Sequence, residues 1–140
     1  PFDKNTSLGR ALLEPTRIYV KSCLAALAAG GVNGFAHITG GGLLENLPRM
    51  FAERDLAALI DMDSWDRPGV FSWLQQAGNI DELEMLRTFN CGVGFVICVA
   101  AEDAERACRL LIDLGETAKP IGRIVAPDTP AGTGQLTIPR

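Results

Sequence analysis

The sequence predicts an α/β fold, a single layered domain in which helices pack on a mixed β-sheet. Segments typical of strands alternate with segments of helical periodicity, and such alternation favours helices layered on a sheet. Neither a linker nor a repeat of fixed period divides the 140 residues, a length that suits one ordinary domain. The composition, with 47% hydrophobic and 21% charged residues, is that of a folded globular protein. We therefore expect residues 1–140 to form one domain.

The first half of the chain predicts helices and strands separated by glycine and proline breaks. Residues 7–14 suit a short helix or turn that Pro15 ends. Residues 18–29 carry apolar side chains at helical spacing, and the two glycines that follow are typical of a helix C-terminus. We further expect a buried strand at residues 35–39, a helix at 43–50 that Pro48 limits, and a strand at 56–60 whose alanines would also suit a helix.

The second half contains the clearest strand and the clearest helix. Residues 93–99 are rich in β-branched and aromatic side chains, and residues 101–114 place apolar side chains on one helix face. Asp81 is suited to cap a helix that runs to Arg87, with Glu84 completing a capping box. The remaining elements are a helix at 70–76 whose first turn begins at Pro68, a strand at 121–125, a loop at 127–134 and a terminal strand at 135–138.

Charge and hydrophobicity exclude two classes of partner. The formal net charge is −4, and the 13 Lys and Arg residues are scattered among 17 Asp and Glu residues, without the basic patch that nucleic acid requires. The longest apolar runs, residues 23–29 and 93–101, fall short of the roughly 20 residues that span a bilayer, and no signal peptide is visible. We expect neither a nucleic acid nor a membrane as partner. Because the chain opens with Pro1, we expect the gene product to start elsewhere.

The spacing of cysteine and histidine does not favour a metal site. Cys23, Cys91, Cys98 and Cys108 form no C-x-x-C pair, and His37 is distant from all of them in the sequence. Thiols in apolar segments act as small hydrophobic groups. We expect reduced cysteines, a cytoplasmic location and no metal held by this chain.

The segment at residues 37–46, His-Ile-Thr-Gly-Gly-Gly-Leu-Leu-Glu-Asn, is the strongest candidate for a binding site. A strand runs into three glycines, which let the backbone approach a ligand closely. The free N–H groups and the dipole of the following helix favour an anion such as phosphate. The alternative is a tight strand-to-helix turn in which the glutamate only complements the helix dipole. The candidate ligand contacts are Thr39, Gly40, Gly41, Gly42, Glu45 and Asn46.

His37 is the candidate for proton transfer. Side chains alternate along a strand, so His37 is expected to share a face with Phe35 and Thr39. Imidazole is the side chain that most readily exchanges protons near neutral pH, and the positive end of a helix would favour its neutral form. The alternative is a core histidine held by hydrogen bonds.

A second candidate segment, residues 87–94 (Arg-Thr-Phe-Asn-Cys-Gly-Val-Gly), leads into the clearest strand. Asn90 offers both a donor and an acceptor, and Gly92 lies beside the start of the strand. Cys91 as a nucleophile would need His37 as its base, a pairing that the sequence does not show. The alternative is a glycine-rich turn in which Asn90 adopts the left-handed conformation.

Two smaller features carry weaker predictions. Residues 13–19 place Thr16 and Arg17 after a proline, which suits a domain joint or a ligand contact. Trp65 and Trp73 are expected to pack in the core or on a covered face. Neither a P-loop nor a G-x-S-x-G motif occurs, which argues against P-loop nucleotide binding and the usual hydrolase elbow.

Five ordered motifs resemble the C-terminal domain of the aminoimidazole ribonucleotide synthetases, the phosphoribosylformylglycinamidine cyclo-ligases. The resemblance covers nearly the whole chain and is far more specific than a single glycine run. The chain departs from the family at residues 50–53, Met-Phe-Ala-Glu, where a Val-Leu-Pro-like continuation is common, and we expect only a changed surface loop. The motifs are L-L-E-P-T-R-I-Y-V-K (12–21), A-H-I-T-G-G-G-L-L-E-N-L-P-R (36–49), F-S-W-L-Q-Q-A-G-N (71–79), M-L-R-T-F-N-C-G-V-G (85–94) and I-G-R-I-V (121–125).

The resemblance implies an ATP-dependent ring closure in purine biosynthesis. ATP would activate the formyl amide oxygen of formylglycinamidine ribonucleotide as a phosphorylated imidate, the amidine-side nitrogen would attack, and phosphate would leave. Positioning and electrostatic stabilisation would supply most of the catalysis. The family's active site lies in a cleft between two domains, on a homodimer.

The resemblance also implies that this chain is one part of such an enzyme. The family's N-terminal domain, which carries most of the ATP and Mg²⁺ contacts and the main dimer interface, is absent from this sequence, so we expect the chain to be inactive alone. The C-terminal domain would contribute the glycine loop. A further hypothesis is that His37 and Glu45 act on protons or substrate amides, while Thr39, Gly40, Gly41, Gly42, Asn46, Asn90 and Gly92 hold substrate or phosphate.

Two alternatives stay open from the sequence. A related two-domain enzyme, such as a formylglycinamidine synthetase, a selenophosphate synthetase or a hydrogenase-maturation protein, would share this architecture, although the Thr-Phe-Asn-Cys-Gly-Val-Gly stretch argues for the cyclo-ligase. A non-catalytic module that binds a phosphorylated metabolite would need only the glycine loop. Whether that loop would hold the 5′-phosphate of the substrate or a phosphate of ATP is equally open.

Overall fold

The strands form two antiparallel sheets in the computed structural model of the chain, which describes residues 5–132 and 135–139. One sheet pairs β1 (Val32–His37) with β3 (Phe95–Val99), and His37 lies opposite Phe95. The other has the order β4–β2–β5, with β2 (Ala57–Asp61) between β4 (Gly122–Val125) and β5 (Gln135–Pro139). The predicted α/β class is confirmed. The sheet itself differs from the single mixed sheet that was expected, because β1 finds its partner in β3 rather than in β2.

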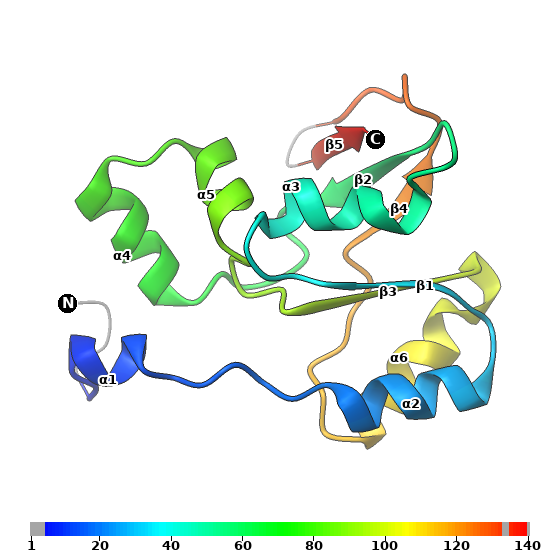
Figure 1. Cartoon of the computed structure of the whole chain (residues 1–140), viewed down its shortest axis with the longest axis horizontal. Helices are drawn as coiled ribbons and strands as arrows, with labels where there is room; N and C mark the ends of the chain where they lie inside the picture. Colours follow the sequence, from blue (N-terminus) through cyan, green and yellow to red (C-terminus); the bar gives the residue numbers. More distant parts are fainter. Residues whose placement is uncertain (1–4, 133–134, 140) are drawn as a thin grey trace.

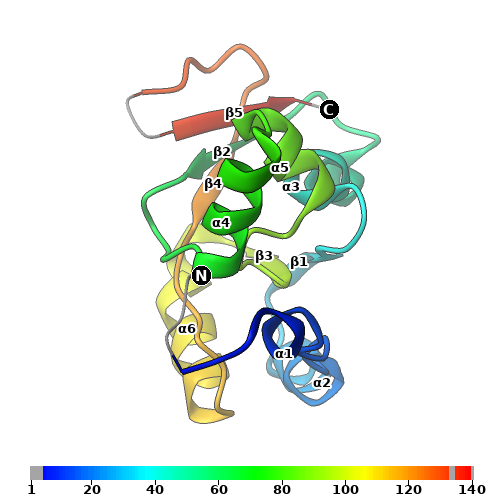
Figure 2. The ribbon, with the colours of Figure 1, turned by 90° about the vertical axis from the view of Figure 1, so that its left-hand side faces the viewer.

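The β1–β3 pair lies between two helices and the second sheet. In Figure 1 and Figure 2, α2 (Val20–Ala29) and α6 (Ala104–Asp113) lie together on one side of this pair, and the β4–β2–β5 sheet lies on the other. The remaining helices are α1 (Leu8–Leu12), α3 (Gly42–Asn46), the 3-10 helix η1 (Leu47–Phe51), α4 (Gly69–Gly78), α5 (Glu82–Thr88) and the 3-10 helix η2 (Ala101–Asp103). The 3-10 helix η1 contacts β1 of one sheet and β2 and β5 of the other, and Figure 1 shows α4 and α5 at one end of the molecule.

Most predicted elements are present with shifted ends. The expected helix at 43–50 divides, because Pro48 lies in the first turn of η1 and the α-helical bonds give way to a tighter turn there. The expected helix at 101–114 likewise begins as the 3-10 turn η2. The expected strand at 93–99 begins only at Phe95, and that at 35–39 already ends at His37. The predicted loop at 127–134 lies partly outside the described residues.

The N-cap of α5 forms as expected, but the capping box does not. Asp81 has extended backbone angles and its carboxylate accepts a hydrogen bond from the Leu83 N–H at 2.9 Å, so the predicted N-cap is confirmed. Glu84 does not complete a capping box. Its carboxylate instead accepts hydrogen bonds from Arg87 and Thr88, each at 3.1 Å, because both side chains lie one turn further along the same helix.

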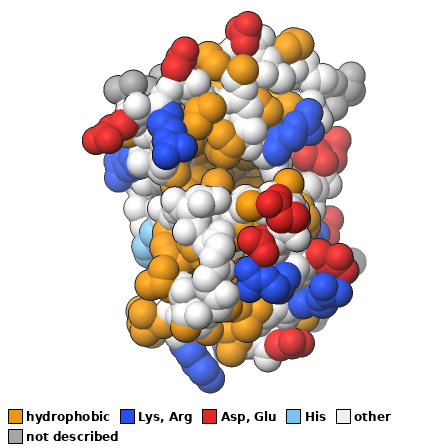
Figure 3. Space-filling view, turned by 90° about the vertical axis from the view of Figure 1, so that its right-hand side faces the viewer, with side chains coloured by type: hydrophobic (Ala, Val, Ile, Leu, Met, Phe, Trp, Pro, Cys, Tyr) orange, Lys and Arg blue, Asp and Glu red, His pale blue; other side chains and the backbone are white. Residues whose placement is uncertain are grey.

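The core lies where α3, η1 and α5 meet the two sheets. Its fully buried side chains are Ile38, Leu43, Leu47, Met85, Leu86 and Cys91. Beside this core a groove of about 1090 Å³ opens between the β1–β3 and β4–β2–β5 sheets, and Figure 3 shows apolar side chains on its floor. Its walls include Val96 and Cys98 of β3, Leu111 of α6, Phe51 of η1 and Ile60 of β2.

One face of α2 remains uncovered. The helix carries one charged residue, Lys21, and its Val20, Leu24 and Leu27 side chains are 62%, 61% and 58% exposed. A helix that is apolar on all sides normally packs on all sides. Ile18, just before the helix, is 83% exposed and extends this apolar strip. Within the described residues no helix is both long and apolar enough to cross a bilayer.

Replacing Asp81 with alanine should lower the free energy of unfolding by about 1 kcal/mol, because the Leu83 N–H loses its acceptor. Urea denaturation of the wild type and the Asp81→Ala and Asp81→Asn variants measures this effect. The asparagine keeps an oxygen acceptor and should retain most of the stability. An Asp81→Asn variant as unstable as Asp81→Ala would show that the cap is not the source of the effect.

Candidate functional site

A glycine turn connects the end of β1 to α3. The Ile38 N–H, just after the strand, donates to the Gly94 carbonyl at 3.0 Å and holds the start of the turn against β3. Gly41 and Gly42 have φ values of 97° and 53°, and the Gly42 N–H donates to the Thr39 carbonyl at 2.9 Å. The N–H of Gly42 is therefore occupied within the turn. Among the described residues, no acceptor takes the N–H groups of Gly40 and Gly41.

Gly42 also allows the turn to lie against the end of α5. A Cβ atom at this position would lie 2.0 Å from the Leu86 carbonyl oxygen and 2.7 Å from that of Phe89. No side chain fits between these groups, so packing as well as the positive φ requires glycine here. This contact brings the first candidate segment against the second.

Asn46 holds the turn from inside. It is 3% exposed, and its Nδ2 group donates to the Gly42 carbonyl at 2.8 Å and the Gly40 carbonyl at 3.2 Å. Both amide protons are thereby used within the protein. Asn46 therefore shapes the turn. Only its Oδ1 atom would remain to make the ligand contact that was expected of this residue.

Glu45 lies over the glycine turn and faces solvent. Its Oε2 is 2.8 Å from the position that a Cβ of Gly41 would occupy, and its side chain is 56% exposed. Its Oε1 lies 4.0 Å from Nε of Arg87, whose Nη1 also pairs with Glu84 at 3.1 Å. Arg87 is thus a cation that the second segment supplies beside the first. In the sequence Arg87 is only the first residue of the second segment, and nothing local indicates its distant partner.

The second segment forms an Asx turn. The Asn90 Oδ1 atom accepts from the Gly92 N–H at 3.0 Å, and the Asn90 carbonyl accepts from the Val93 N–H at 2.9 Å. The alternative of a glycine-rich turn assigned the left-handed conformation to Asn90, but the residues with positive φ are Cys91, at 49°, and Gly92, at 101°. The Nδ2 group of Asn90 donates no hydrogen bond to the described residues.

Cys91 is buried and unsuited to nucleophilic attack. Its exposed fraction is 0%, and its thiol donates to the Met85 carbonyl at 3.5 Å. Burial raises the pKa of the Cys91 thiol, which keeps it protonated. The nucleophile hypothesis is therefore wrong, and Cys91 serves as part of the core.

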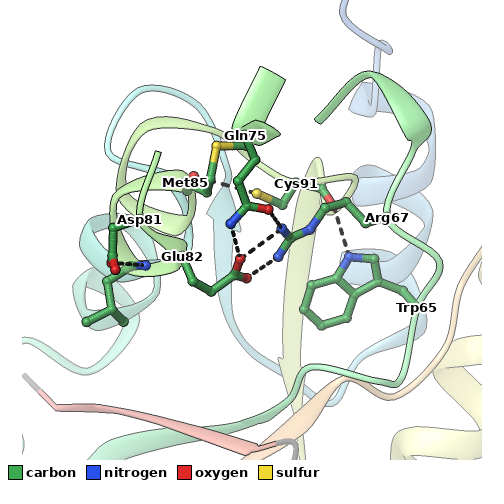
Figure 4. Close-up of polar contacts among 8 residues, drawn as sticks. Trp65, Arg67, Gln75, Asp81, Glu82, Met85 and Cys91 are labelled. Carbon is green, nitrogen blue, oxygen red and sulfur yellow. Dashed lines mark hydrogen bonds and ion pairs between the residues drawn. The ribbon is translucent and has the colours of Figure 1, made fainter. Parts of the chain in front are cut away.

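A polar network fixes the position of the second segment, as Figure 4 shows. The Trp65 Nε1–H donates to the Cys91 carbonyl at 3.0 Å. Pro68 packs where a Cβ of Gly92 would lie, with its Cδ 2.6 Å from that position. Between them, Arg67 forms an ion pair with Glu82. Gln75 completes the network by accepting from Arg67 at 3.3 Å and donating to Glu82 at 2.8 Å. Trp65 is half-buried against the core, as predicted.

The two segments share one small hollow of about 210 Å³. Thr39 lines it from the glycine turn, and Thr88 and Asn90 line it from the second segment. Its apolar walls are Ile38, Phe71 and Phe89. The structure thus brings together two predicted site residues, Thr39 and Asn90, that are far apart in the sequence. A hydroxyl and an amide around an open hollow can bind the polar groups of a small ligand.

His37 lies outside this hollow, on the β1–β3 sheet. Its side chain is exposed, and its ring packs on Tyr19 and Phe95, with ring centroids 5.9 Å and 5.7 Å away. The alternative of a hydrogen-bonded core histidine is therefore wrong. His37 and Thr39 do not share a strand face as expected, since β1 ends at His37 and the alternation of side chains ends with it.

No metal ligand set is formed by the residues that the structure describes. Within 5–132 and 135–139, three or more His, Cys, Asp or Glu side chains do not come together in a way that could hold an ion. The carboxylates near the candidate site instead accept hydrogen bonds or pair with arginines. These residues do not fit Mg²⁺, and no chemical step is assigned to it on this chain.

Gly42→Ala should destabilise the protein by about 3 kcal/mol, because the new methyl group would overlap the Leu86 carbonyl. Gly40→Ala is the matched control, since a Cβ there meets nothing within 4 Å, and it should change stability by less than about 0.5 kcal/mol. Chemical denaturation of both variants tests the contact. Equal effects of the two substitutions would contradict it.

The network around Glu82 should make stability depend on acid pH. The hydrogen bond from Arg67 holds the pKa of Glu82 below its ordinary value. The folded protein is therefore stabilised above the pKa of the unfolded carboxyl, about 4.3, and the stabilisation is lost as the pH falls below it. The side chain is 49% exposed, so the loss should stay below about 1 kcal/mol.

Urea denaturation at pH 7 and pH 3 measures this loss in the wild type and in Glu82→Gln. The glutamine variant should lose less stability on acidification, because it has no proton to bind at this position. Parallel losses in the two proteins would assign the acid sensitivity to other carboxylates.

Comparisons with known proteins identify the family. The family model described as "AIR synthase related protein, C-terminal domain" matches residues 2–134. The bifunctional purine biosynthetic protein ADE1 of Schizosaccharomyces pombe is 53% identical over 125 residues, which are 89% of this chain and 16% of that protein. The phosphoribosylformylglycinamidine cyclo-ligase of Neisseria meningitidis is 51% identical over 123 residues, 88% of this chain and 36% of that enzyme. The chain spans little more than a third of the one relative and a sixth of the other, and it belongs to the AIR synthase related family, whose C-terminal domain it represents.

Proposed function

We propose that this chain is the substrate-side domain of an ATP-dependent cyclo-ligase that converts formylglycinamidine ribonucleotide to aminoimidazole ribonucleotide in purine biosynthesis. The observation that carries the proposal is the hollow shared by Thr39 and Asn90, because it joins the two segments expected to hold the substrate. The name of the Neisseria meningitidis relative, a phosphoribosylformylglycinamidine cyclo-ligase, supports this reaction over those of related ATP-dependent enzymes, and the name of the Schizosaccharomyces pombe relative supports a role in purine biosynthesis.

Binding would use the groups that the fold leaves free. The N–H groups of Gly40 and Gly41, the hydroxyl of Thr39 and the Nδ2 group of Asn90 are donors that can contact phosphate or ribose oxygens. The two turns would be shaped by Gly42, Asn46 and Gly92. The glycines allow close packing because they have no side chain, and the Asn46 amide and the Gly92 N–H form hydrogen bonds within their own turns. α3 has five residues, so its dipole adds little, and the donors themselves would supply most of the attraction.

The chemical steps would rest on His37 and Glu45. ATP supplies the phosphoryl group that turns the formyl amide oxygen into a leaving group. His37 would take a proton from the attacking amidine-side nitrogen as the ring closes and phosphate departs. Glu45 is exposed beside Gly41 and would accept a hydrogen bond from a substrate amide, orienting it for attack.

The rest of the site would come from another part of the full-length protein. We assign Mg²⁺ and most contacts to ATP to an N-terminal domain, and we expect the complete enzyme to be a cytoplasmic homodimer. The relatives are about three to six times longer than the matched region, which leaves room for such a domain. The exposed apolar strip of Ile18, Val20, Leu24 and Leu27 supports a covering partner. The chain alone is expected to be inactive.

ATP-dependent formation of aminoimidazole ribonucleotide tests this function. The full-length gene product should form the product and the 140-residue chain should not. In the full-length protein His37→Ala should lower kcat by about 100-fold or more, as for loss of a general base. Arg109→Ala, on the exposed face of α6, is the control and should leave kcat unchanged. A folded full-length protein without activity would overturn the proposed reaction, and an active His37→Ala variant would remove only the role of His37.

A further inference from the structure

We infer that Tyr19 is a positioning residue for His37: its ring, held against Gly94, fixes the orientation of the imidazole. The catalytic part of this inference rests on the proposed role of His37. Tyr19 belongs to the segment before α2, for which the sequence suggested a domain joint or a ligand contact. The structure instead places it on the sheet that carries the histidine.

The rings of Tyr19 and Phe95 contact each other and the ring of His37. The centroid of the Tyr19 ring lies 5.9 Å from that of His37 at an interplanar angle of 73°, and 5.3 Å from that of Phe95. Phe95 lies directly opposite His37 in the β1–β3 pair, with ring centroids 5.7 Å apart. Edge-on and tilted aromatic contacts of this kind favour defined ring orientations. Because the imidazole forms no hydrogen bond with the described residues, these two rings are what orients it.

Gly94 provides the space for the Tyr19 ring. A Cβ on Gly94 would lie 2.0 Å from the Tyr19 hydroxyl oxygen and 2.9 Å from Cζ, so any side chain would displace the tyrosine. The Gly94 carbonyl accepts the hydrogen bond from Ile38, the residue after His37. Tyr19 thus lies against Gly94, which is hydrogen-bonded to the residue that follows the histidine. This explains the second glycine of the Cys-Gly-Val-Gly segment, which the hollow does not use.

The backbone on both sides of Tyr19 is held in place. Before it, the Arg17 guanidinium donates to the Gly115 carbonyl at 2.8 Å and pairs with Glu116 at 3.0 Å. After it, the Ser22 hydroxyl donates to the same carboxylate at 2.6 Å. The Glu116 side chain is 15% exposed and Ser22 is 6% exposed. Arg17 therefore anchors this segment to the loop after α6.

The Tyr19 hydroxyl contributes no hydrogen bond to the described residues. Burial raises the pKa of Tyr19, and the phenol stays neutral near pH 7. Tyr19 would therefore orient His37 through the packing of its ring and not through its hydroxyl group. A phenylalanine should therefore replace Tyr19, whereas a leucine should not.

The chain has one histidine, so NMR of its ring carbons and protons reports His37 without ambiguity. Tyr19→Leu in the 140-residue chain should shift the His37 ring resonances and remove the nuclear Overhauser contacts between His37 and residue 19. Tyr19→Phe should restore both. Phe35→Leu is the matched control, because the Phe35 ring packs on Phe95 and, among the described residues, forms no ring contact with His37, and it should leave the His37–Tyr19 contacts in place. Unchanged His37 resonances in a folded Tyr19→Leu variant would overturn the inference.

Gly94→Ala gives a second route that removes no aromatic ring. It should shift the same resonances in the wild type, because its methyl group displaces the tyrosine. In the Tyr19→Leu background it should add little further change. A full additional shift there would mean that Gly94 acts on His37 independently of Tyr19, contrary to the inference.

Activity of the full-length protein separates this inference from the proposed function. Tyr19→Leu should lower kcat by up to about 100-fold with little change in KM, as for a misplaced catalytic group, and Tyr19→Phe should restore it. If His37→Ala abolished turnover and Tyr19→Leu shifted the His37 resonances without lowering kcat, positioning would be excluded. If His37→Ala had no effect on kcat, the proposed role of His37 would fail, while the NMR result would still decide whether Tyr19 orients it.

Discussion

The contact between Gly42 and the carbonyl groups of Leu86 and Phe89 is the constraint on which the candidate site depends. It sets how closely the turn after β1 approaches the end of α5, and therefore places Thr39 beside Asn90. Leu43, Met85 and Leu86 are fully buried next to it, so apolar packing stabilises the same approach. Asn46 adds two hydrogen bonds inside the turn. The two segments can pack this closely because residue 42 is a glycine and has no side chain.

Local sequence was sufficient to predict most elements and insufficient to pair them. Glycines, prolines and Asp81 mark helix ends through local chemistry, and those predictions agree with the structure to within a few residues. The partner of a strand depends on residues far along the chain. Four consecutive residues of β2, Ala57 to Ile60, are buried, which suits a central strand, but nothing local indicates that β4 and β5 flank it. A single mixed sheet was expected because the local sequence does not indicate which strands pair.

The candidate site was predictable in its segments and less so in its roles. The glycine turn and the Asn90 turn were both found from residue types, and they meet in space. The role of Asn46 could not be read from the sequence, because its partners are carbonyl groups of the turn itself. The sequence also placed His37 and Thr39 on one face, but the strand ends between them. Tyr19 and Arg87 act on residues that are distant in sequence, so no local pattern indicated them.

The electrostatic character of the site follows from the same packing. Glu45 places a negative charge over Gly41, which opposes an anion there, while Arg87 partly offsets it from 4.0 Å away. Arg87 also pairs with Glu84 and is half-exposed, so its compensation is screened. The neutral donors of Thr39, Gly40, Gly41 and Asn90 would therefore carry more of the recognition than charge does.

The measurement that tests this account most directly is a titration of the ¹⁵N-labelled chain with formylglycinamidine ribonucleotide, followed by NMR. If the two segments form one site, the amide signals of residues 39–41 and 90–92 should shift together and fit one common dissociation constant. Shifts confined to one segment at saturation, or two segments that fit different constants, would contradict the claim that they form a single site.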